Sequence, residues 1–410
     1  MSEAGPRKMG RWFAAPEIDG LPERVRSAGA FLPNPLPSTL RLNPPTYRIL
    51  AEAEQALGRL DEAAARLSNR AGLVRLAQLR DVRSSGELGG IHAGLREMLM
   101  ADLPGVVETP EVDGKLVRYL RANDAALAWV AGGGPINLVL LGQLGAILDG
   151  ARERLGAYAE DEVSEVAWRT GPGWLGGPDP REAYLITVPP GAELQTGGVQ
   201  WSAWVDSGCE APLLARVALG HYQLAVLSPV AHSGHLSRLY ITLALLRSGA
   251  LRDAVLPVSE WLSRHRDEYR DRILRLVHGA DVDGFLVFFA SGIAELCRSQ
   301  MQFILRAERL CERHLDRLGK RMDGIVRVTR DLAATPVTTN LQIAQRSGIS
   351  VQHAANLTKQ LKRMGVIRSL NGKAYRQVFL VPDVMDLFEL SYPGPPDSDD
   401  EVFGDPAGIG

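Results

Sequence analysis

The chain has 410 residues, 45% of them hydrophobic, which is enough for two or three domains with their own cores. Its formal net charge of −2 excludes a chain that binds polyanions or polycations through overall charge, so charge must be compared locally. The three cysteines are widely spaced, which argues against a zinc site or a disulfide framework and for a reducing cytoplasm. No apolar run reaches about 18 residues, so we expect neither a signal peptide nor contact with a membrane.

The first part of the chain predicts an arm followed by a helix. Residues 1–45 are rich in proline, glycine and arginine, and they predict an extended arm that wraps a neighbouring domain. From Thr46 to about Leu67 apolar residues recur at helical spacing, and Thr46 is the predicted cap. The segment 79–101 predicts a further packing helix.

Two more amphipathic helices are predicted over residues 113–131 and 136–157. The turn between them contains three adjacent glycines and Pro135. Such a run could bind phosphate, but no strand precedes it and no GKS or GKT follows it. We therefore favour a plain helix–helix turn.

Residues 168–190 predict a β-hairpin, because aromatic and β-branched residues surround Gly, Pro and Asp turns. An exposed edge of such a hairpin can pair with a target peptide. A purely structural loop is an equal alternative. The candidate peptide-binding residues are Arg169, Thr170, Trp174, Gly176 and Gly177.

The stretch 221–238, HYQLAVLSPVAHSGHLSR, predicts a helix, a break at Ser228-Pro229, a short polar loop and a second helix. Free backbone N–H groups at the start of the second helix can form an anion site.

This stretch resembles the signature H-P-F-x-D-G-N-G-R-x-x-R of the Fic (Fido-fold) family, whose members typically transfer AMP from ATP to a protein hydroxyl. Pro229 and Gly234 fit, the loop is one residue short, and Ser228 stands at the position of the catalytic histidine. The resemblance implies catalytic positions at Ser228 and His232, and nucleotide contacts from Ser233, Gly234, His235 and Arg238. It implies ATP and Mg²⁺ as cofactors, without making either certain, and we assign no metal ligand.

Flanking segments extend the resemblance over about residues 30–390. The helix from Thr46 resembles the N-terminal segment of the Fic subgroup that carries a C-terminal winged helix. The segment 168–190 resembles the family's flap. Positions that fit the stretch after the signature are Pro257, Ser259, His265, Arg266, Glu268, Tyr269, Asp271, Phe288, Phe289, Gly292 and Glu295.

The segment 79–101 also resembles the family's inhibitory helix, S-S-x-I-E-G, whose glutamate pairs with a signature arginine. Ser84, Ser85 and Gly89 fit, but Leu88 occupies the position of the glutamate. Glu87 lies one residue early, which rotates it by about 100° on a helix. We therefore favour a plain packing helix over an inhibitory one.

The departures from the signature predict impaired or lost AMP transfer. Serine lacks the basicity of histidine, and loss of a general base costs about 10²–10⁴ in rate. His232 replaces the acidic residue, and Mg²⁺ prefers oxygen ligands. An active transferase with a rearranged site, built from His221, His232 or His235, is the alternative. Each of these is more simply an ordinary loop or core histidine.

One long amphipathic helix is predicted from about Phe285 to Asp316, followed by a connector. Residues 335–390 then predict a winged helix-turn-helix, with Gly348 at the turn and Ser350 capping the candidate recognition helix. A β-hairpin is expected around Asn371-Gly372.

The charge of this last domain indicates a nucleic-acid partner. From Leu341 to Val381 there are three lysines, four arginines and no Asp or Glu, a local charge of +7. DNA binding is the favoured interpretation, and a protein-docking or dimer module is the alternative. The candidate base readers are Gln352, His353 and Asn356, and the candidate phosphate contacts are Lys359, Lys373 and Arg376.

The predicted fold is mainly α, with a Fido-type helical core, a small β-hairpin flap and a C-terminal winged helix-turn-helix. The predicted function is that of a degenerate Fic-family protein that binds DNA or regulates; the alternative is an active protein adenylyltransferase. Expected partners are DNA, a protein target at the flap and a second copy of the chain. The predicted divisions are 1–45 (arm), 46–112 (N-terminal helical segment), 113–316 (core), 317–334 (connector), 335–390 (winged helix) and 391–410 (acidic, disordered tail).

Overall fold

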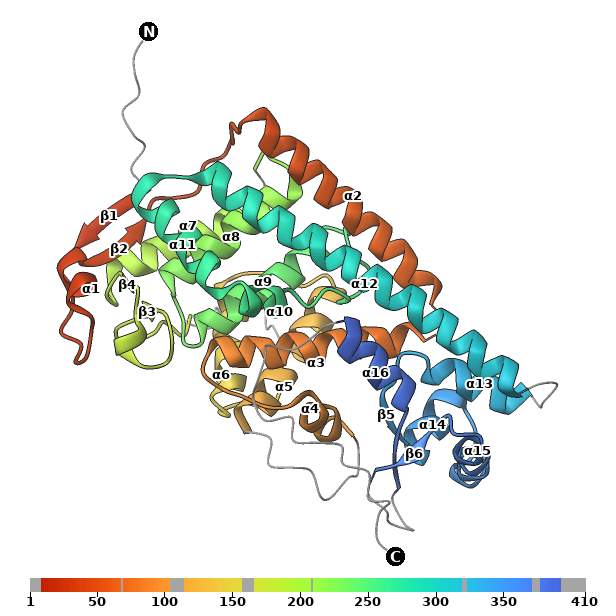
Figure 1. Cartoon of the computed structure of the whole chain (residues 1–410). Coiled ribbons are helices and arrows are strands. Elements are labelled where there is room, and N and C mark those ends of the chain that lie inside the picture. The colour runs from red at the N-terminus through yellow and green to blue at the C-terminus, as the bar shows by residue number, and fades with distance from the viewer. Residues whose placement is uncertain are drawn as a thin grey trace, which may run out of the picture.

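A computed structural model describes residues 9–67, 69–103, 114–156, 166–207, 209–318, 323–370 and 377–391. Over these ranges the chain is mainly helical, with two small sheets, and this confirms the predicted fold class (Figure 1). Within the described ranges, every helix is too short or too polar to cross a membrane.

The N-terminal arm is not extended throughout, because it contains two strands and a short helix. These are β1 (Gly10–Phe13), α1 (Glu23–Ala28) and β2 (Ala30–Pro33). β2 pairs with β1 in antiparallel fashion and with β4 (Leu185–Thr187) in parallel fashion. The arm is therefore joined by backbone hydrogen bonds to the region of the predicted hairpin.

The hairpin itself is confirmed. β3 (Trp174–Leu175) pairs with β4 in antiparallel register, and a 3₁₀ turn, η1 (Pro180–Glu182), lies between them. The strand order is β1-β2-β4-β3, so both edges of β4 are occupied and β3 lies at the edge of the sheet. Any strand added on this side would have to pair with the two residues of β3.

The helix predicted from Thr46 begins earlier. α2 (Pro44–Arg66) has Asn43 as its N-cap and two prolines in its first turn, where a missing N–H is tolerated. The prediction that Thr46 is the cap is wrong, since its hydroxyl donates to Asp283 Oδ1 at 2.5 Å. Asp283 lies at the start of α12 (Val282–Leu318), and α2 and α12 run side by side along one edge of the molecule (Figure 1).

The single helix predicted over 79–101 is two helices. α3 (Arg70–Leu88) ends at Gly89-Gly90, where Gly90 has a φ of 77°, and α4 (Leu95–Ala101) follows. α5 (Gly114–Ala131) is as predicted, and the glycine run after it is a plain turn. α6 (Leu138–Leu148) is shorter than predicted because Gly150, with a φ of 78°, ends it.

The centre of the core is built from helices that are apolar on nearly every side, α8 and α9 in particular. The neighbouring helices cover these two and keep the segment between them in place. In chain order the helices of this part are α7 (Ala192–Ser207), α8 (Leu213–Leu227), α9 (Ser233–Arg247), α10 (Val258–Arg264) and α11 (Arg266–Gly279).

The long helix α12 leads from this core into a C-terminal unit, by which we mean the described residues from 323 to 391 (Figure 1). Residues predicted as a connector form α13, whose apolar residues pack into a second core, because they recur on one face of that helix. The unit consists of α13 (Asp323–Leu332), β5 (Val337–Thr339), α14 (Asn340–Ser347), α15 (Val351–Arg363), β6 (Arg368–Ser369), β7 (Val378–Leu380) and α16 (Pro382–Ser391).

The sheet of the C-terminal unit has the order β5-β7-β6, and its strands β5 and β7 are buried on both faces. Val378 and Leu380 belong to the main core, whereas Phe379 and Val381 belong to the second core. This alternation follows from the two-residue period of a strand. The unit is therefore docked on the core through its sheet. The predicted turn at 371–372, Lys373, Arg376 and the tail from 392 lie outside the described residues.

Candidate functional site

The loop between α8 and α9 is short and tightly held. Ser228 ends α8 with a φ of 47°, and His232 precedes α9 with a φ of 57°. Left-handed backbone is uncommon for residues other than glycine, and it costs free energy that the surroundings must offset. The loop of residues 228–232, which begins and ends with these two left-handed positions, thus has a defined conformation.

Ser233 closes the loop onto itself. Its hydroxyl donates to the carbonyl of Val230 at 2.7 Å and accepts from the Val230 N–H at 3.2 Å. Ser233 is almost completely buried, whereas Gly234, the next residue, is exposed. Of the four residues expected to contact nucleotide, Ser233, Gly234, His235 and Arg238, Gly234 is the exposed one.

Arg238, one turn further along α9, is held by α3. Its Nε donates to the hydroxyl of Ser85, and its Nη2 donates to the carbonyl of Ser85, both at 2.9 Å. Burial lowers the pKa of Arg238, and the nearby carboxylate of Asp81 opposes that shift. Two donors of the guanidinium are therefore already hydrogen-bonded to the hydroxyl and the backbone carbonyl of Ser85.

His235 is a buried residue whose two ring nitrogens both have partners. Nδ1 lies 2.7 Å from Ser85 Oγ, and Nε2 lies 3.0 Å from Asn123 Oδ1. Because Arg238 donates to Ser85 Oγ, the Ser85 hydroxyl donates to Nδ1, and Nε2–H donates to Asn123. This assignment follows from the network. Burial and the Arg238 charge hold the pKa of His235 well below its usual value. His235 is thus a neutral core residue.

His221 is also a core residue. Its Nδ1 donates to the Ser237 carbonyl at 2.8 Å, and its Nε2 accepts from the Tyr269 hydroxyl at 2.9 Å. Burial lowers the pKa of His221 to about 4, so the ring is neutral at pH 7. His221 and His235 therefore have the structural role that was the simpler expectation.

The predicted inhibitory residues of α3 point elsewhere. Glu87 accepts from the Ser263 hydroxyl at 3.2 Å and lies 3.6 Å from Arg83 Nε. Leu88 packs against the main core. The α3 residue that accepts hydrogen bonds from Arg238 is Ser85, which is uncharged, and not a carboxylate.

His232 is the histidine of this loop that remains partly open to solvent. Its Nε2 lies 2.7 Å from Asp149 Oδ1, at the end of α6. A carboxylate in this position fixes the tautomer with hydrogen on Nε2 and leaves the lone pair on Nδ1. The arrangement has the geometry of an oriented base.

Arg169 braces the loop against the hairpin. It donates to the Ser228 carbonyl at 2.6 Å, to the Gly171 carbonyl at 2.7 Å and to Thr187 Oγ1 at 3.0 Å, and it also contacts the Val188 carbonyl. Its burial lowers the pKa to about 10. Arg169 therefore holds the 228–232 loop on β4, and its donors are directed into the protein.

The other predicted flap residues shape the hairpin. The indole N–H of Trp174 donates to the Gly177 carbonyl at 3.0 Å. Gly176 has a φ of 144° and lies so close to Glu182 that a side chain would clash there. Thr170 is exposed beside Arg169. These contacts fix the turn between β3 and β4.

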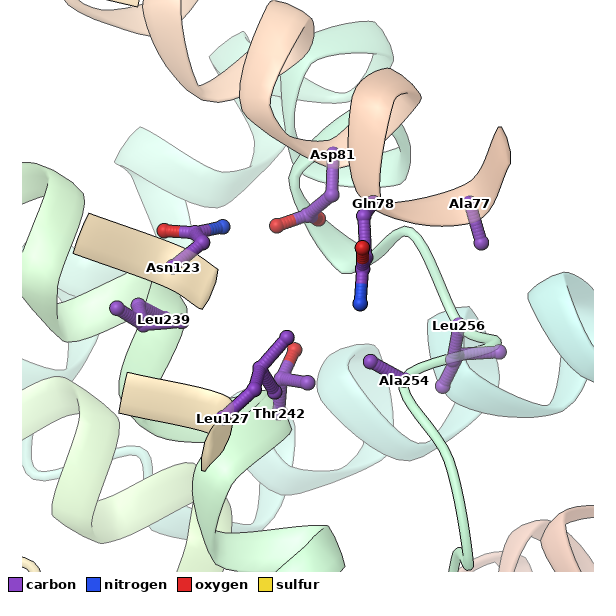
Figure 2. Close-up of a pocket in the computed structure, with 9 residues that line it drawn as sticks. All are labelled: Ala77, Gln78, Asp81, Asn123, Leu127, Leu239, Thr242, Ala254 and Leu256. Carbon is purple, nitrogen blue, oxygen red and sulfur yellow. The ribbon is translucent and has the colours of Figure 1, made fainter. Parts of the chain in front are cut away.

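A small pocket lies between α3, α5, α9 and the segment before α10. Figure 2 shows the side chains of Gln78, Asp81 and Asn123 converging on it, with Thr242 opposite. Asp81 also accepts from the N–H of Ser259 at 2.7 Å, near the start of α10. Desolvation raises the pKa of Asp81 to about 6. The Asp81 carboxyl group therefore caps α10 and, because of its raised pKa, titrates close to neutral pH.

The residues of this site do not fit ATP and Mg²⁺ as they are arranged. Arg238 is engaged by Ser85, and Ser233 is engaged by Val230. The described ranges contain no group of three or more His, Cys, Asp or Glu side chains able to hold a metal ion.

A family comparison identifies the N-terminal helices. Residues 47–128, from α2 through most of α5, match the family model of the Fic/DOC family N-terminal region. Over this region the chain is similar to the Fic/DOC family. The match includes Ser85 and Asn123, so two of the groups around His235 and Arg238 come from the matched region. No curated protein matches the chain.

Three solved structures of Fic proteins are similar to the chain at low identity. A Fic family protein from Desulfovibrio desulfuricans G20 has 16% identity and a TM-score of 0.49, covering 83% of this chain and 97% of that one. Fic-1 from C. elegans has 19% identity and a TM-score of 0.43, covering 65% and 75%. A Fic domain containing signaling protein from Bacteroides thetaiotaomicron has 13% identity and a TM-score of 0.40, covering 62% and 97%.

The second candidate site is the surface of α15. Ser350 caps this helix by accepting from the N–H of His353 at 3.1 Å, and Gly348 has a φ of 61° at the turn before it, both as predicted. The residues of α15 that are exposed are Val351, Gln352, His353, Asn356, Lys359, Lys362 and Arg363.

Sequence reasoning missed the partners on other helices. Asn123 and Asp149 lie far from the loop in sequence, and nothing in their local pattern marks them. Asp81 was hidden in the same way, among the other charged residues of α3. Ser85 was noted, but as part of a motif whose glutamate is replaced. Only the packing of α3, α5 and α6 around α9 brings these groups together.

Proposed function

We propose that this Fic-family protein binds duplex DNA through its C-terminal unit, which acts as a winged helix, and that AMP transfer by its core is strongly impaired. The observation that carries this proposal is the exposed face of α15. There, Lys359, Lys362 and Arg363 reach solvent, and the surrounding sequence contains no carboxylate from residue 341 to residue 381. Cations arranged in this way bind phosphates and release counterions.

The helix-turn-helix arrangement supports the proposal. Gly348 makes the turn between α14 and α15, and Thr358 donates to Asn340 Oδ1 at 2.9 Å across the two helices. α15 lies at the outer edge of the C-terminal unit (Figure 1). A recognition helix needs this kind of open position to enter the major groove.

The core supports the second half of the proposal. Ser228 stands where the signature has its histidine, His235 is a neutral core residue, and Arg238 is held by Ser85. A general base accounts for about 10²–10⁴ of the rate in such a reaction. Without this base, and with the arginine engaged, AMP transfer is expected to be slow or absent.

Fluorescence anisotropy of a labelled duplex with the full chain tests DNA binding. We expect binding at low salt that weakens steeply between about 50 and about 200 mM salt. The double variant Lys359→Gln, Arg363→Gln should lose at least about tenfold in affinity at fixed salt. Arg24→Gln, an exposed arginine on α1 at the opposite end of the molecule, is the matched control and should bind as the wild type does. Binding that does not weaken with salt, or that is as strong for the double variant as for the wild type, would refute the proposal.

A second candidate, nucleotidyl transfer with a rearranged site, is favoured by one observation. His232 is oriented by Asp149 at 2.7 Å and stands at the start of α9. Incubation with labelled ATP and Mg²⁺ would then label the protein or a target, and His232→Ala and Arg238→Ala would abolish the label. His92→Ala, another exposed histidine, is the matched control. Absence of label with the wild type would reject this candidate.

A further inference from the structure

We infer that α15 reads A·T base pairs in the major groove through Gln352, Asn356 and Val351. This inference rests on the proposed DNA binding and deepens it, because it names the base pair. The evidence is the order in which side chains occur along the exposed face of the helix.

A single ridge runs along α15. Gln352, Asn356, Lys359 and Arg363 are spaced four, three and four residues apart, so they lie on one face of the helix. The opposite face is the buried one, with Ala354, Leu357 and Leu361 in the second core. The ridge is thus the part of α15 that points away from the protein.

The ridge changes in chemistry along its length. The first half carries two amides, and the second half carries two cations. In a helix-turn-helix protein, the N-terminal residues of the recognition helix contact base edges. The amide of Gln or Asn pairs with two atoms of adenine, N6 and N7, whereas Lys and Arg bind phosphates or guanine. The position of the amides at the start of the helix therefore favours adenine.

Val351 adds an apolar contact next to the first amide. It is the first residue of α15, and half of its surface is exposed, 50%. Leu341, at the start of α14, is also exposed, at 40%, and the bond between Asn340 and Thr358 ties the start of α14 to α15. The thymine paired with adenine presents a methyl group in the major groove, and an apolar side chain fits it. One A·T pair therefore satisfies both Gln352 and Val351.

His353 is not part of this ridge. Its Nε2 lies 3.5 Å from the position that a Cβ atom added to Gly324 would take. His353 is thus turned toward the first turn of α13. The base-reading set is therefore narrower than the sequence predicted.

Selection of duplexes from a random-sequence pool with the full chain tests the inference. Selected sites should contain A·T pairs, and replacing the thymines of a selected duplex by uracil, which removes only the methyl group, should weaken wild-type binding several-fold. Val351→Ala should bind the thymine and uracil duplexes equally. Gln352→Ala should lose roughly 5- to 100-fold for the selected site and less for an unrelated duplex.

Lys359→Ala is the matched control, because a phosphate contact should weaken binding to every duplex by the same factor. Selected sites made of G·C pairs, or equal binding of thymine and uracil duplexes by the wild type, would overturn the inference. Binding without any sequence preference would overturn it too, while leaving the proposed DNA binding intact. Failure of the wild type to bind any duplex at low salt would instead reject the proposed function.

Discussion

The first turns of α9 and the ridge of α15 both carry polar side chains, yet they differ in what those side chains contact. In α9, Arg238, His235 and Ser233 are all bonded to the protein itself. Along α15 the corresponding side chains are exposed. A motif that resembles a binding site is available to a ligand only when the fold leaves its donors unused.

The cost of burial explains why the two regions diverge. A buried arginine or histidine needs partners, because an unsatisfied polar group in a protein interior costs about 1–3 kcal/mol or more. Ser85 and Asn123 supply these partners around α9. On α15 water supplies them, so a phosphate or base can replace water without breaking the fold.

The largest expected effect concerns the rigidity of the helix that holds Arg238. Arg80, in the middle of α3, is fully buried and pairs with Glu260 through Nε at 2.8 Å and Nη2 at 2.6 Å. Arg80→Ala leaves a buried carboxylate with Arg264 as its remaining partner. We expect a loss of about 3 kcal/mol in the free energy of unfolding, measured by urea denaturation. Arg66→Ala, which breaks an exposed pair with Glu62 on α2, is the control and should cost less than about 1 kcal/mol. Equal losses of stability in the two variants would show that the buried pair of Arg80 and Glu260 does not hold α3 in place.

A pH series tests the carboxyl group beside Arg238. The pKa of Asp81 is raised to about 6 in the folded protein, so between about pH 4 and pH 6 the folded state binds more protons at this site. Its contribution to stability therefore falls as the pH rises through that window. Asp81→Asn removes this titration. Between pH 4 and pH 7, the free energy of unfolding of Asp81→Asn should therefore rise relative to that of the wild type by up to roughly 3 kcal/mol.

His221 makes stability change with pH in the opposite direction. Its pKa in the folded protein is lowered to about 4, so the unfolded chain takes up the proton first as the pH falls. Its contribution is present above the unfolded pKa, near 6.5, and is lost toward about pH 4. In Asp81→Asn, stability should thus rise with pH from about 4 to about 6.5. Parallel profiles for the two proteins would contradict this assignment.

A smaller effect is expected at the cap of α15. Ser350→Ala removes the acceptor for the N–H of His353 and should cost about 1 kcal/mol. Hydrogen exchange should quicken in α15 and leave α8 and α9 unchanged. Gln345→Ala, at an exposed position of α14, is the control. Faster exchange in the main core as well would mean that the two regions unfold together.

The smallest effect on stability is expected at the ridge itself. Lys359 is exposed, so Lys359→Ala should change the free energy of unfolding by less than about 0.5 kcal/mol. It should nevertheless reduce the slope of log affinity against log salt by about 1. A loss of stability without a change of slope would mean that Lys359 serves the fold and does not contact phosphate.

Local sequence patterns predicted much of the fold. The helical spacing around α2, α5 and α12, the hairpin between β3 and β4, and the cap at Ser350 are confirmed. The errors lie where one residue overrides a pattern, as when Gly90 divides 79–101 into two helices. Residues 323–332 of the predicted connector form α13, and its partners belong to α12 and α15.

The sequence by itself determined which side chains are available: the serine at position 228, the missing glutamate at position 88 and the excess of cations after residue 341. Only the tertiary structure decided which of them are free to act. Ser85, Asn123 and Asp149 come from three different helices, and no spacing in the sequence places them against α9. The reason is physical, since local pattern sets the face of a helix and packing sets what that face meets.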